Sequence, residues 1–209
     1  MANKIGRALK KGPGKSSASR TRATLAAAVI VFGSFSLSPE TRAQPTCEGA
    51  MRLAARSNDM PLNILYAVGL TESGRNGVLQ PFEMNIDGRS EHSSGLREAI
   101  TKFHVERSRG ARMIDIGCMQ INYRWHGDRF KSLASIFDPG ENVDYAARFL
   151  KELRSREGSW TLAVARYNAG PNNDRAQKTY VCSVIGRMVQ AGVGQWTIPA
   201  RQFCGESAR

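Results

Sequence analysis

Histidine and cysteine are scarce in this chain of 209 residues, which contains three His, four Cys and no C-x-x-C pair. His92, His104 and His126 do not lie at ligand-like spacing from the cysteines. Because structural zinc sites use closely spaced Cys and His ligands, the sequence predicts no metal site. We likewise expect no cofactor. There are also no internal repeats, which excludes a solenoid.

The sequence also lacks an apolar run long enough to span a membrane. A membrane-spanning helix needs about 20 apolar residues, and the apolar run Ala23–Leu37 is shorter. This run follows a basic segment that ends near Arg22 and precedes Thr41-Arg42-Ala43, which has small residues where signal peptidase cuts. The layout predicts a signal peptide over residues 1–43 and a mature domain over 44–209. We therefore expect a periplasmic protein without a stable membrane span. An uncleaved membrane anchor is the alternative.

The formal net charge of +12 is typical of a nucleic-acid binder until it is located along the chain. Residues 1–43 contain eight Lys or Arg and one acid, a net of +7, which leaves +5 for residues 44–209. This mild excess contains no basic stripe interleaved with aromatic residues. We therefore predict no nucleic-acid partner.

All four cysteines lie in the predicted mature part: Cys47, Cys118, Cys182 and Cys204. An even number of cysteines in an exported chain predicts disulfides. Three pairings are possible, and the sequence does not choose among them. For Cys118, a free buried thiol is the alternative.

Helical periodicity predominates in the mature part, over residues 47–57, 61–74, 95–106, 143–154, 160–167 and 180–189. Strand signal is confined to residues 81–91, where an alternating segment ends in Asp87-Gly88, and to the ambiguous run 113–116. The tail from Gly192 is expected to wrap the surface. The expected fold class is mainly α with a small β-hairpin.

The segment Pro61–Gly74 predicts one amphipathic helix, because its apolar residues recur at helical spacing: Leu62, Leu65, Tyr66, Gly69 and Leu70. Pro61 suits the first turn and Gly74 the end. Glu72 falls beside the apolar stripe at the negative end of the helix dipole. Burial and the dipole both raise the pKa of this carboxyl, as a general acid near neutral pH requires. Taken alone, an ordinary exposed glutamate is the simpler interpretation.

Three short blocks change that interpretation: Glu72-Ser73-Gly74, Gly117-Cys118-Met119-Gln120-Ile121-Asn122 and Arg166-Tyr167-Asn168-Ala169-Gly170-Pro171, with Tyr180 after them. In this order, on an exported helical chain, they resemble the catalytic domain of the soluble-type (SLT) lytic transglycosylases. The resemblance covers roughly residues 47–190. It implies a lysozyme-like fold and cleavage of peptidoglycan glycan strands. Cys118 and Arg166 depart from the family pattern, which has Leu and Ala there.

The resemblance implies that Glu72 is the single catalytic acid. It would protonate the oxygen that links N-acetylmuramic acid to N-acetylglucosamine, and then accept the proton of the C6 hydroxyl as a 1,6-anhydro ring closes. Contacts with the substrate are implied for Ser73, Met119, Gln120, Asn122, Tyr167, Asn168 and Tyr180. The residues themselves also allow structural roles, such as core packing for Met119 and a turn-stabilising amide for Gln120. Tyr180 is further expected to reach Glu72 by a hydrogen bond.

Residues 74–116 form an unusually long connection of 43 residues between the first two blocks, with an enlarged hairpin over Phe82–Arg89. This is similar to a subgroup of small transglycosylases tied to secretion, conjugation or flagellar assembly. We therefore expect peptidoglycan as the substrate and components of such an apparatus as protein partners.

Among the acids in this connection are Glu83, Asp87, Glu91 and Asp115. We interpret them as solvated hairpin residues. If one of them were a second carboxylate that directs a water, the protein would be a muramidase that hydrolyses the same bond. Two further alternatives remain, a non-catalytic wall-binding or assembly protein and a secreted effector or phage-like lysin.

Overall fold

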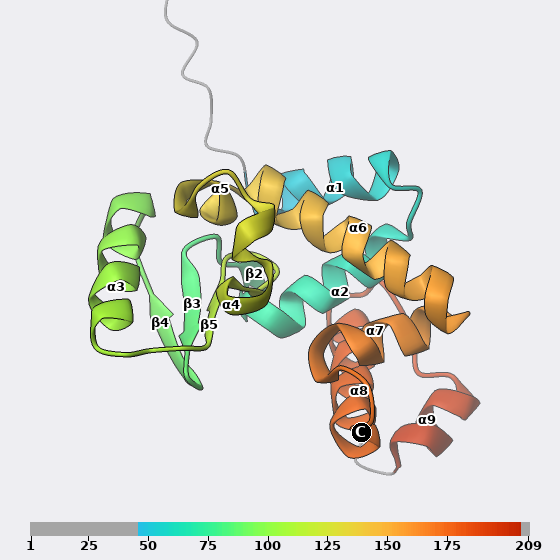
Figure 1. The fold of residues 1–209 in the computed structure, drawn as a ribbon. Coiled ribbons are helices and arrows are strands. Elements are labelled where there is room, and N and C mark those ends of the chain that lie inside the picture. Colours follow the sequence, from blue (N-terminus) through green and yellow to red (C-terminus); the bar gives the residue numbers. More distant parts are fainter. Residues whose placement is uncertain (1–45, 206–209) are drawn as a thin grey trace, which may run out of the picture. The chain divides into compact units, whose positions relative to one another are not determined.

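Helices make up most of residues 46–205, the part of the chain that the computed structural model describes (Figure 1). They are α1 (Cys47–Ser57), α2 (Leu62–Ser73), α3 (Leu96–Ser108), α4 (Tyr123–His126), α5 (Leu133–Phe137), α6 (Pro139–Glu157), α7 (Trp160–Ala169), α8 (Asp174–Gln190) and α9 (Ile198–Cys204), with a 3-10 turn η1 (Gly127–Arg129) after α4. The predicted signal peptide lies outside the described residues. Within residues 46–205, no helix has both the length and the apolar character to cross a membrane.

Helix α2 packs against α1 on one side and α8 on another. The apolar stripe predicted for it is too narrow, because Ala67 and Val68 are also fully buried, whereas Leu62 is 42% exposed. Pro61 is the N-cap residue and lies outside the helix, so its predicted place in the first turn is wrong by one position. Gly74 is the C-cap, as predicted. The helix is therefore buried on more faces than the sequence pattern indicates, which places its C-terminal end inside the fold.

Capping side chains set the limits of the C-terminal helices. Asp138 accepts a hydrogen bond from the backbone of Glu141 at the start of α6, and Gly158 ends that helix with a left-handed backbone. Helix α8 begins at Asp174, six residues before the apolar pattern that predicted it, because Asn173 caps a polar first turn. The pattern 180–189 marks only the part of α8 that reaches the core.

Strands β3 (Glu83–Ile86), β4 (Arg89–His92), β5 (Ile114–Ile116) and β6 (Ile121–Asn122) form one antiparallel sheet in the order β4-β3-β5-β6. The predicted hairpin is confirmed as β3–β4, and the ambiguous run 113–116 contains β5. A second, two-stranded sheet pairs β1 (Gly74–Arg75) with β2 (Val78–Leu79). The expected mainly α fold with a small β-hairpin is therefore confirmed, and short segments with little strand signal extend the hairpin into a four-stranded sheet.

Two disulfides connect distant parts of the described chain. Cys47 on α1 pairs with Cys118, directly before the buried Met119, so the alternative of a free thiol at Cys118 is wrong. Cys182 on α8 pairs with Cys204 on α9. The tail from Gly192 thus forms a short helix that a covalent bond holds on α8.

Candidate active site

Glu72, at the C-terminal end of α2, lines a cavity of about 290 Å³ that five other helices and strands help to enclose. β5 and β6 contribute one wall, and α4, α6 and α7 contribute the others. The lining residues are Glu72, Met113, Asp115, Gln120, Ile121, Asn122, Trp125, His126, Tyr145, Phe149, Tyr167 and Asn168. The three sequence blocks therefore meet at one place, although about 100 residues of chain separate the first from the last.

Burial raises the pKa of Glu72 to about 7. The hydroxyl of Tyr180 donates a hydrogen bond to Glu72 Oε1 and opposes this rise, whereas the negative charge of Asp115 adds to it. The direction of the shift predicted from the sequence is confirmed, and so is the hydrogen bond from Tyr180. A carboxyl with this pKa is protonated in part near neutral pH, so it can both donate and accept a proton.

Tyr167 and Tyr180 stay neutral beside this acid. Burial, followed by the charge of Glu72, raises the pKa of both phenols well above 10. The hydroxyl of Tyr167 donates to the backbone oxygen of Met119 at 2.8 Å, and its ring lines the cavity. Tyr180 is buried behind Glu72 and does not line the cavity. The hydroxyl of Tyr167 therefore holds the second sequence block, Gly117–Asn122 (the central block), in place, and the hydroxyl of Tyr180 orients the acid.

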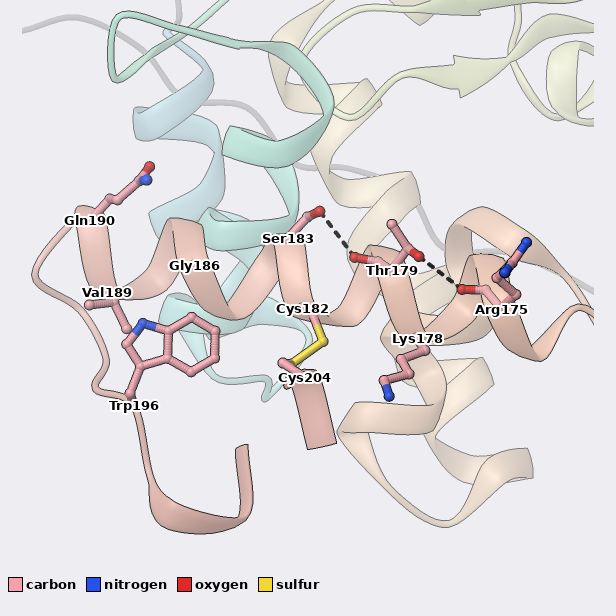
Figure 2. A pocket seen from close by; sticks show the side chains of 10 residues that line it. All are labelled: Arg175, Lys178, Thr179, Cys182, Ser183, Gly186, Val189, Gln190, Trp196 and Cys204. Atoms are coloured by element: carbon pink, nitrogen blue, oxygen red, sulfur yellow. Dashed lines mark hydrogen bonds between the residues drawn. A yellow bond between two sulfur atoms is a disulfide. The ribbon is translucent and has the colours of Figure 1, made fainter. Parts of the chain in front are cut away.

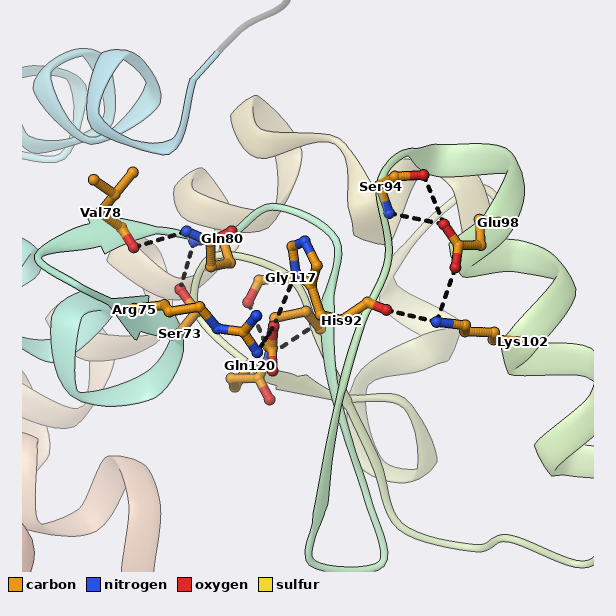
Figure 3. Close-up of polar contacts among 11 residues, drawn as sticks. Ser73, Arg75, Val78, Gln80, His92, Ser94, Glu98, Lys102, Gly117 and Gln120 are labelled. Carbon is orange, nitrogen blue, oxygen red and sulfur yellow. Dashed lines mark hydrogen bonds and ion pairs between the residues drawn. The ribbon is translucent and has the colours of Figure 1, made fainter.

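Gln120 is one of two residues of the central block whose amides line the cavity, the other being Asn122. Its backbone is left-handed, with φ of 46°. Its Nε2 donates to the backbone oxygens of Glu83 at 3.1 Å and Gly117 at 3.0 Å, contacts that lie in the region drawn in Figure 3. Both amide hydrogens are thereby used, which leaves Oε1 as the group that can accept a hydrogen bond from a ligand.

Ser73 and Met119 face away from the cavity. The buried hydroxyl of Ser73 donates to the backbone oxygen of Cys118 at 2.8 Å, and it accepts from the backbone N–H of Gln80 at 3.4 Å (Figure 3). Met119 is fully buried, and its sulfur lies against Gly69 of α2. Both side chains therefore connect α2 to the central block, and neither lines the space where a sugar would bind.

Asn168 and Asn122 line the cavity from α7 and β6. Asn168 is exposed, and within the described residues its side chain makes no hydrogen bond. Asn122 is half-buried, and its Nδ2 donates to Asp115 Oδ1 at 2.6 Å. The two amides thus differ, because one is free to meet a ligand and the other is engaged by a carboxylate.

The four acids singled out in the long connection occupy different environments. Asp87 lies in the exposed hairpin turn and Glu91 pairs with Arg89. Glu83, in contrast, is buried and lies 3.2 Å from His92 Nδ1. Asp115 is half-buried and lines the cavity with Glu72. The interpretation of all four as solvated residues is therefore wrong for Glu83 and Asp115.

Asn142 supports the central block and was not recognised from the sequence as more than part of a helix start. It is completely buried, and its Nδ2 donates to the backbone oxygens of Ile116 and Ile136. Its Oδ1 accepts from the backbone N–H of Met119 at 2.9 Å. All its hydrogen-bonding groups are used within the fold, so this one amide joins β5, the central block and the end of α5.

Aromatic residues on α4 and α6 were also missed. Trp125 lines the cavity and yet is 62% exposed, and the nearby His126 Nδ1 lies 2.7 Å from the hydroxyl of Tyr145. Tyr145 and Phe149 lie one helical turn apart on α6, off the apolar stripe that predicted that helix. Aromatic side chains outside the core-facing stripe are the signal that would have identified them.

A larger cavity of about 790 Å³ lies between α8 and the C-terminal segment, beside the disulfide of Cys182 and Cys204 (Figure 2). The two hydroxyl side chains that line this cavity are engaged within α8. Thr179 donates to the backbone oxygen of Arg175, and Ser183 donates to the backbone oxygen of Thr179. Among the described residues, no Asp or Glu lines it. This cavity lacks an acid for glycosidic chemistry, so the smaller one is the candidate active site. In residues 46–205, no group of three or more His, Cys, Asp or Glu is placed to hold a metal ion.

In comparisons with known proteins, the model of the transglycosylase SLT domain family matches residues 50–185. No curated protein and no solved structure matches the chain significantly. The matched range contains all three sequence blocks, Tyr180 and every residue that lines the candidate site. The mainly α fold with a small antiparallel sheet is consistent with the lysozyme-like domain expected for that family.

Proposed function

Since the chain belongs to the transglycosylase SLT domain family, we propose that it is a lytic transglycosylase that cleaves the glycan strands of peptidoglycan. The bond cleaved is the β-1,4 bond from N-acetylmuramic acid to N-acetylglucosamine, and the product carries a 1,6-anhydro end. One observation carries the proposal. Glu72 lines a cavity to which all three sequence blocks contribute, and burial raises its pKa to about 7.

In the proposed reaction, protonated Glu72 donates to the oxygen of the scissile bond, which then breaks. The N-acetyl group of the substrate supports the positive charge on the anomeric carbon. Glu72, now a carboxylate, accepts the proton of the C6 hydroxyl, and that oxygen bonds to the anomeric carbon. The proton returns to Glu72 and no water is consumed. One group that acts first as acid and then as base needs a pKa near the ambient pH.

The surrounding side chains divide into two groups in this proposal. Those that line the cavity contact the glycan: Gln120 through Oε1, Asn122, Asn168, Tyr167 and the exposed ring of Trp125. Ser73, Met119 and Tyr180 act indirectly, because they join α2 to the central block or orient the acid. This changes the roles expected for the second group from substrate contact to positioning.

We further propose that the protein is exported to the periplasm and opens the wall locally for a secretion, conjugation or flagellar apparatus. Two disulfides support export, because they persist in oxidising compartments. The hairpin β3–β4, which enlarges the sheet beside the cavity, supports the subgroup. Purified candidate components of such an apparatus, tested for binding and for stimulation of cleavage, would test this part of the proposal.

The test of the activity is mass spectrometry of the muropeptides that the purified protein releases from peptidoglycan. We expect anhydro-muropeptides from the parent and none from Glu72→Gln. Glu91→Gln, which changes an acid of β4 that does not line the cavity, is the matched control and should behave as the parent. A folded parent that releases nothing would favour a non-catalytic wall-binding protein.

The muramidase remains the second candidate function because Asp115 lines the cavity together with Glu72. A second carboxylate can direct a water to the anomeric carbon, and the product would then have a reducing end. The same mass spectra distinguish the two enzymes, since hydrolysis adds one water to the mass of the product.

A further inference from the structure

Asp115 is at the centre of a polar row that crosses the sheet. The register pairs Asp115 with Asn85 of β3 on one side and with Asn122 of β6 on the other. The flanking residues of β5, Ile114 and Ile116, are both buried on the opposite face. Because side chains alternate along a strand, Asp115 is directed away from the core and towards the cavity that Glu72 also lines.

The two carboxylates meet in this cavity without a compensating cation. Among the described residues, no Lys or Arg lines it. The titratable groups that face the pair come from four helices, namely His126 of α4, Tyr145 of α6, Tyr167 of α7 and Tyr180 of α8. Burial raises the pKa of the three phenols and lowers that of His126, so none of these groups supplies a positive charge near neutral pH.

The charge of one carboxylate disfavours ionisation of a second carboxyl in the same cavity, and their surroundings decide which of the two keeps its proton to the higher pH. Glu72 is the more strongly affected by burial, which raises its pKa to about 7. Burial also raises the pKa of Asp115, but the hydrogen bond from Asn122 Nδ2 favours its charged form. The proton therefore resides on Glu72 while Asp115 carries the charge.

This inference rests on the proposed function. We propose that Asp115 is a second carboxylate of the reaction, which remains ionised beside protonated Glu72 and stabilises the positive charge that develops on the anomeric carbon. Asp115 forms no bond to the sugar and transfers no proton. Glu72 carries out both proton transfers, and the charge of Asp115 acts while the glycosidic bond is broken and the C6 oxygen has not yet closed the ring.

The test is Asp115→Asn, which keeps the size of the side chain and its place in the sheet. Three quantities are measured against pH: the rate of anhydro-muropeptide release, co-sedimentation with peptidoglycan, and the carboxyl ¹³C shift of Glu72, assigned by its loss in Glu72→Gln. We expect the rate to fall about a hundredfold, as for other groups that stabilise transition-state charge. Binding should change little, and both the alkaline limb of the rate profile and the Glu72 titration should move to lower pH. Glu91→Gln should change none of the three.

A rate within about twofold of the parent, or a Glu72 titration that does not move, would overturn the proposal. A slower variant with an unmoved titration would assign Asp115 a structural role only. A parent without anhydro products would contradict the proposed function instead, and the Glu72 titration would still decide whether the two carboxylates are coupled.

Asn122→Ala provides a second variant if Asp115→Asn does not fold. Loss of the Nδ2 donor should raise the pKa of Asp115. The acid limb of the pH–rate profile should therefore move to higher pH, while the alkaline limb should move less. An acid limb that stays in place or moves to lower pH would count against an ionised Asp115.

Discussion

The hydroxyl of Tyr180 donates a hydrogen bond to Oε1 of Glu72, and 108 residues of sequence separate the two side chains. The acid belongs to α2 and its donor to α8, two helices that pack against each other in the core. The position of the acid therefore depends on the packing of two helices from opposite ends of the domain.

Replacement of Tyr180 by Phe should move the alkaline limb of activity to higher pH, because the hydrogen bond from Tyr180 lowers the pKa of Glu72. The maximal rate should fall about tenfold, since a hydrogen bond to a charged group contributes about 1.5–3 kcal/mol and orients the acid. The rate of muropeptide release between pH 5 and 9 is the measurement, in roughly half-unit steps. Tyr66→Phe is the control, and an alkaline limb displaced to lower pH would contradict the expectation.

Glu72→Gln should stabilise the protein at neutral pH although it removes activity. The carboxyl titrates near its ordinary value of 4.5 in the unfolded chain and at about 7 in the folded one. Between these values the folded state binds more protons, so the stability of the parent falls as pH rises and then becomes constant. The variant lacks this loss, which amounts to about 3 kcal/mol at most.

Urea unfolding of parent and variant at acid, intermediate and alkaline pH measures this difference. We expect a difference near zero at the acid end and the largest advantage of the variant at the alkaline end. A difference that is the same at every pH would show that Glu72 is not buried as a neutral acid.

The two disulfides should differ in what their loss does. The pair Cys47–Cys118 closes a loop with a sequence separation of 71 between fully buried residues, directly before Met119 and Gln120. Replacing both with Ala should lower the free energy of unfolding by about 4 kcal/mol and slow cleavage, because the central block loses its anchor to α1. Urea unfolding and muropeptide release measure the two effects.

The pair Cys182–Cys204 is the matched comparison, since it holds α9, in which no residue is buried. Its replacement by Ala should release the C-terminal segment and leave the rate of cleavage within about twofold of the parent. Equal losses of activity in the two double variants would contradict the role given to Cys118.

Gly117→Ala should destabilise the protein more than Gly110→Ala does. Both glycines have positive φ, at 80° and 96°, so both substitutions strain the backbone by about 1–2 kcal/mol. Only at Gly117 would the added Cβ meet a neighbour, Asn142 Nδ2 at 2.8 Å, whereas nothing lies within 4 Å of Gly110. Displacing that buried amide disturbs three hydrogen bonds and should add about 2 kcal/mol or more. Urea unfolding of both variants is the measurement, and equal losses would contradict a role for Asn142 in holding the block.

Predictions from the sequence succeeded where local chemistry decides the outcome. The hairpin at Asp87-Gly88 follows from a turn that needs positive φ at both residues, and both have it. The sequence-based predictions failed where a segment adopts its structure because of a contact with another part of the chain. β6 has two residues and little signal of its own, and it exists because β5 supplies its pairing partner. Helix α9 has no buried residue, and the disulfide from Cys204 to Cys182 attaches it to α8.

The sequence by itself indicated the family and singled out Glu72 as the candidate acid, because the three ordered blocks and Tyr180 follow one family pattern. Which of those residues reach the cavity was decided only by the tertiary structure. Ser73 is next to Glu72 in sequence, yet a helix rotates successive residues by about 100° and directs it to Cys118. Asp115 has no motif of its own, and it lines the cavity because the strand register places it beside Asn122. Side-chain direction depends on packing and register, which bring together residues that local patterns describe separately.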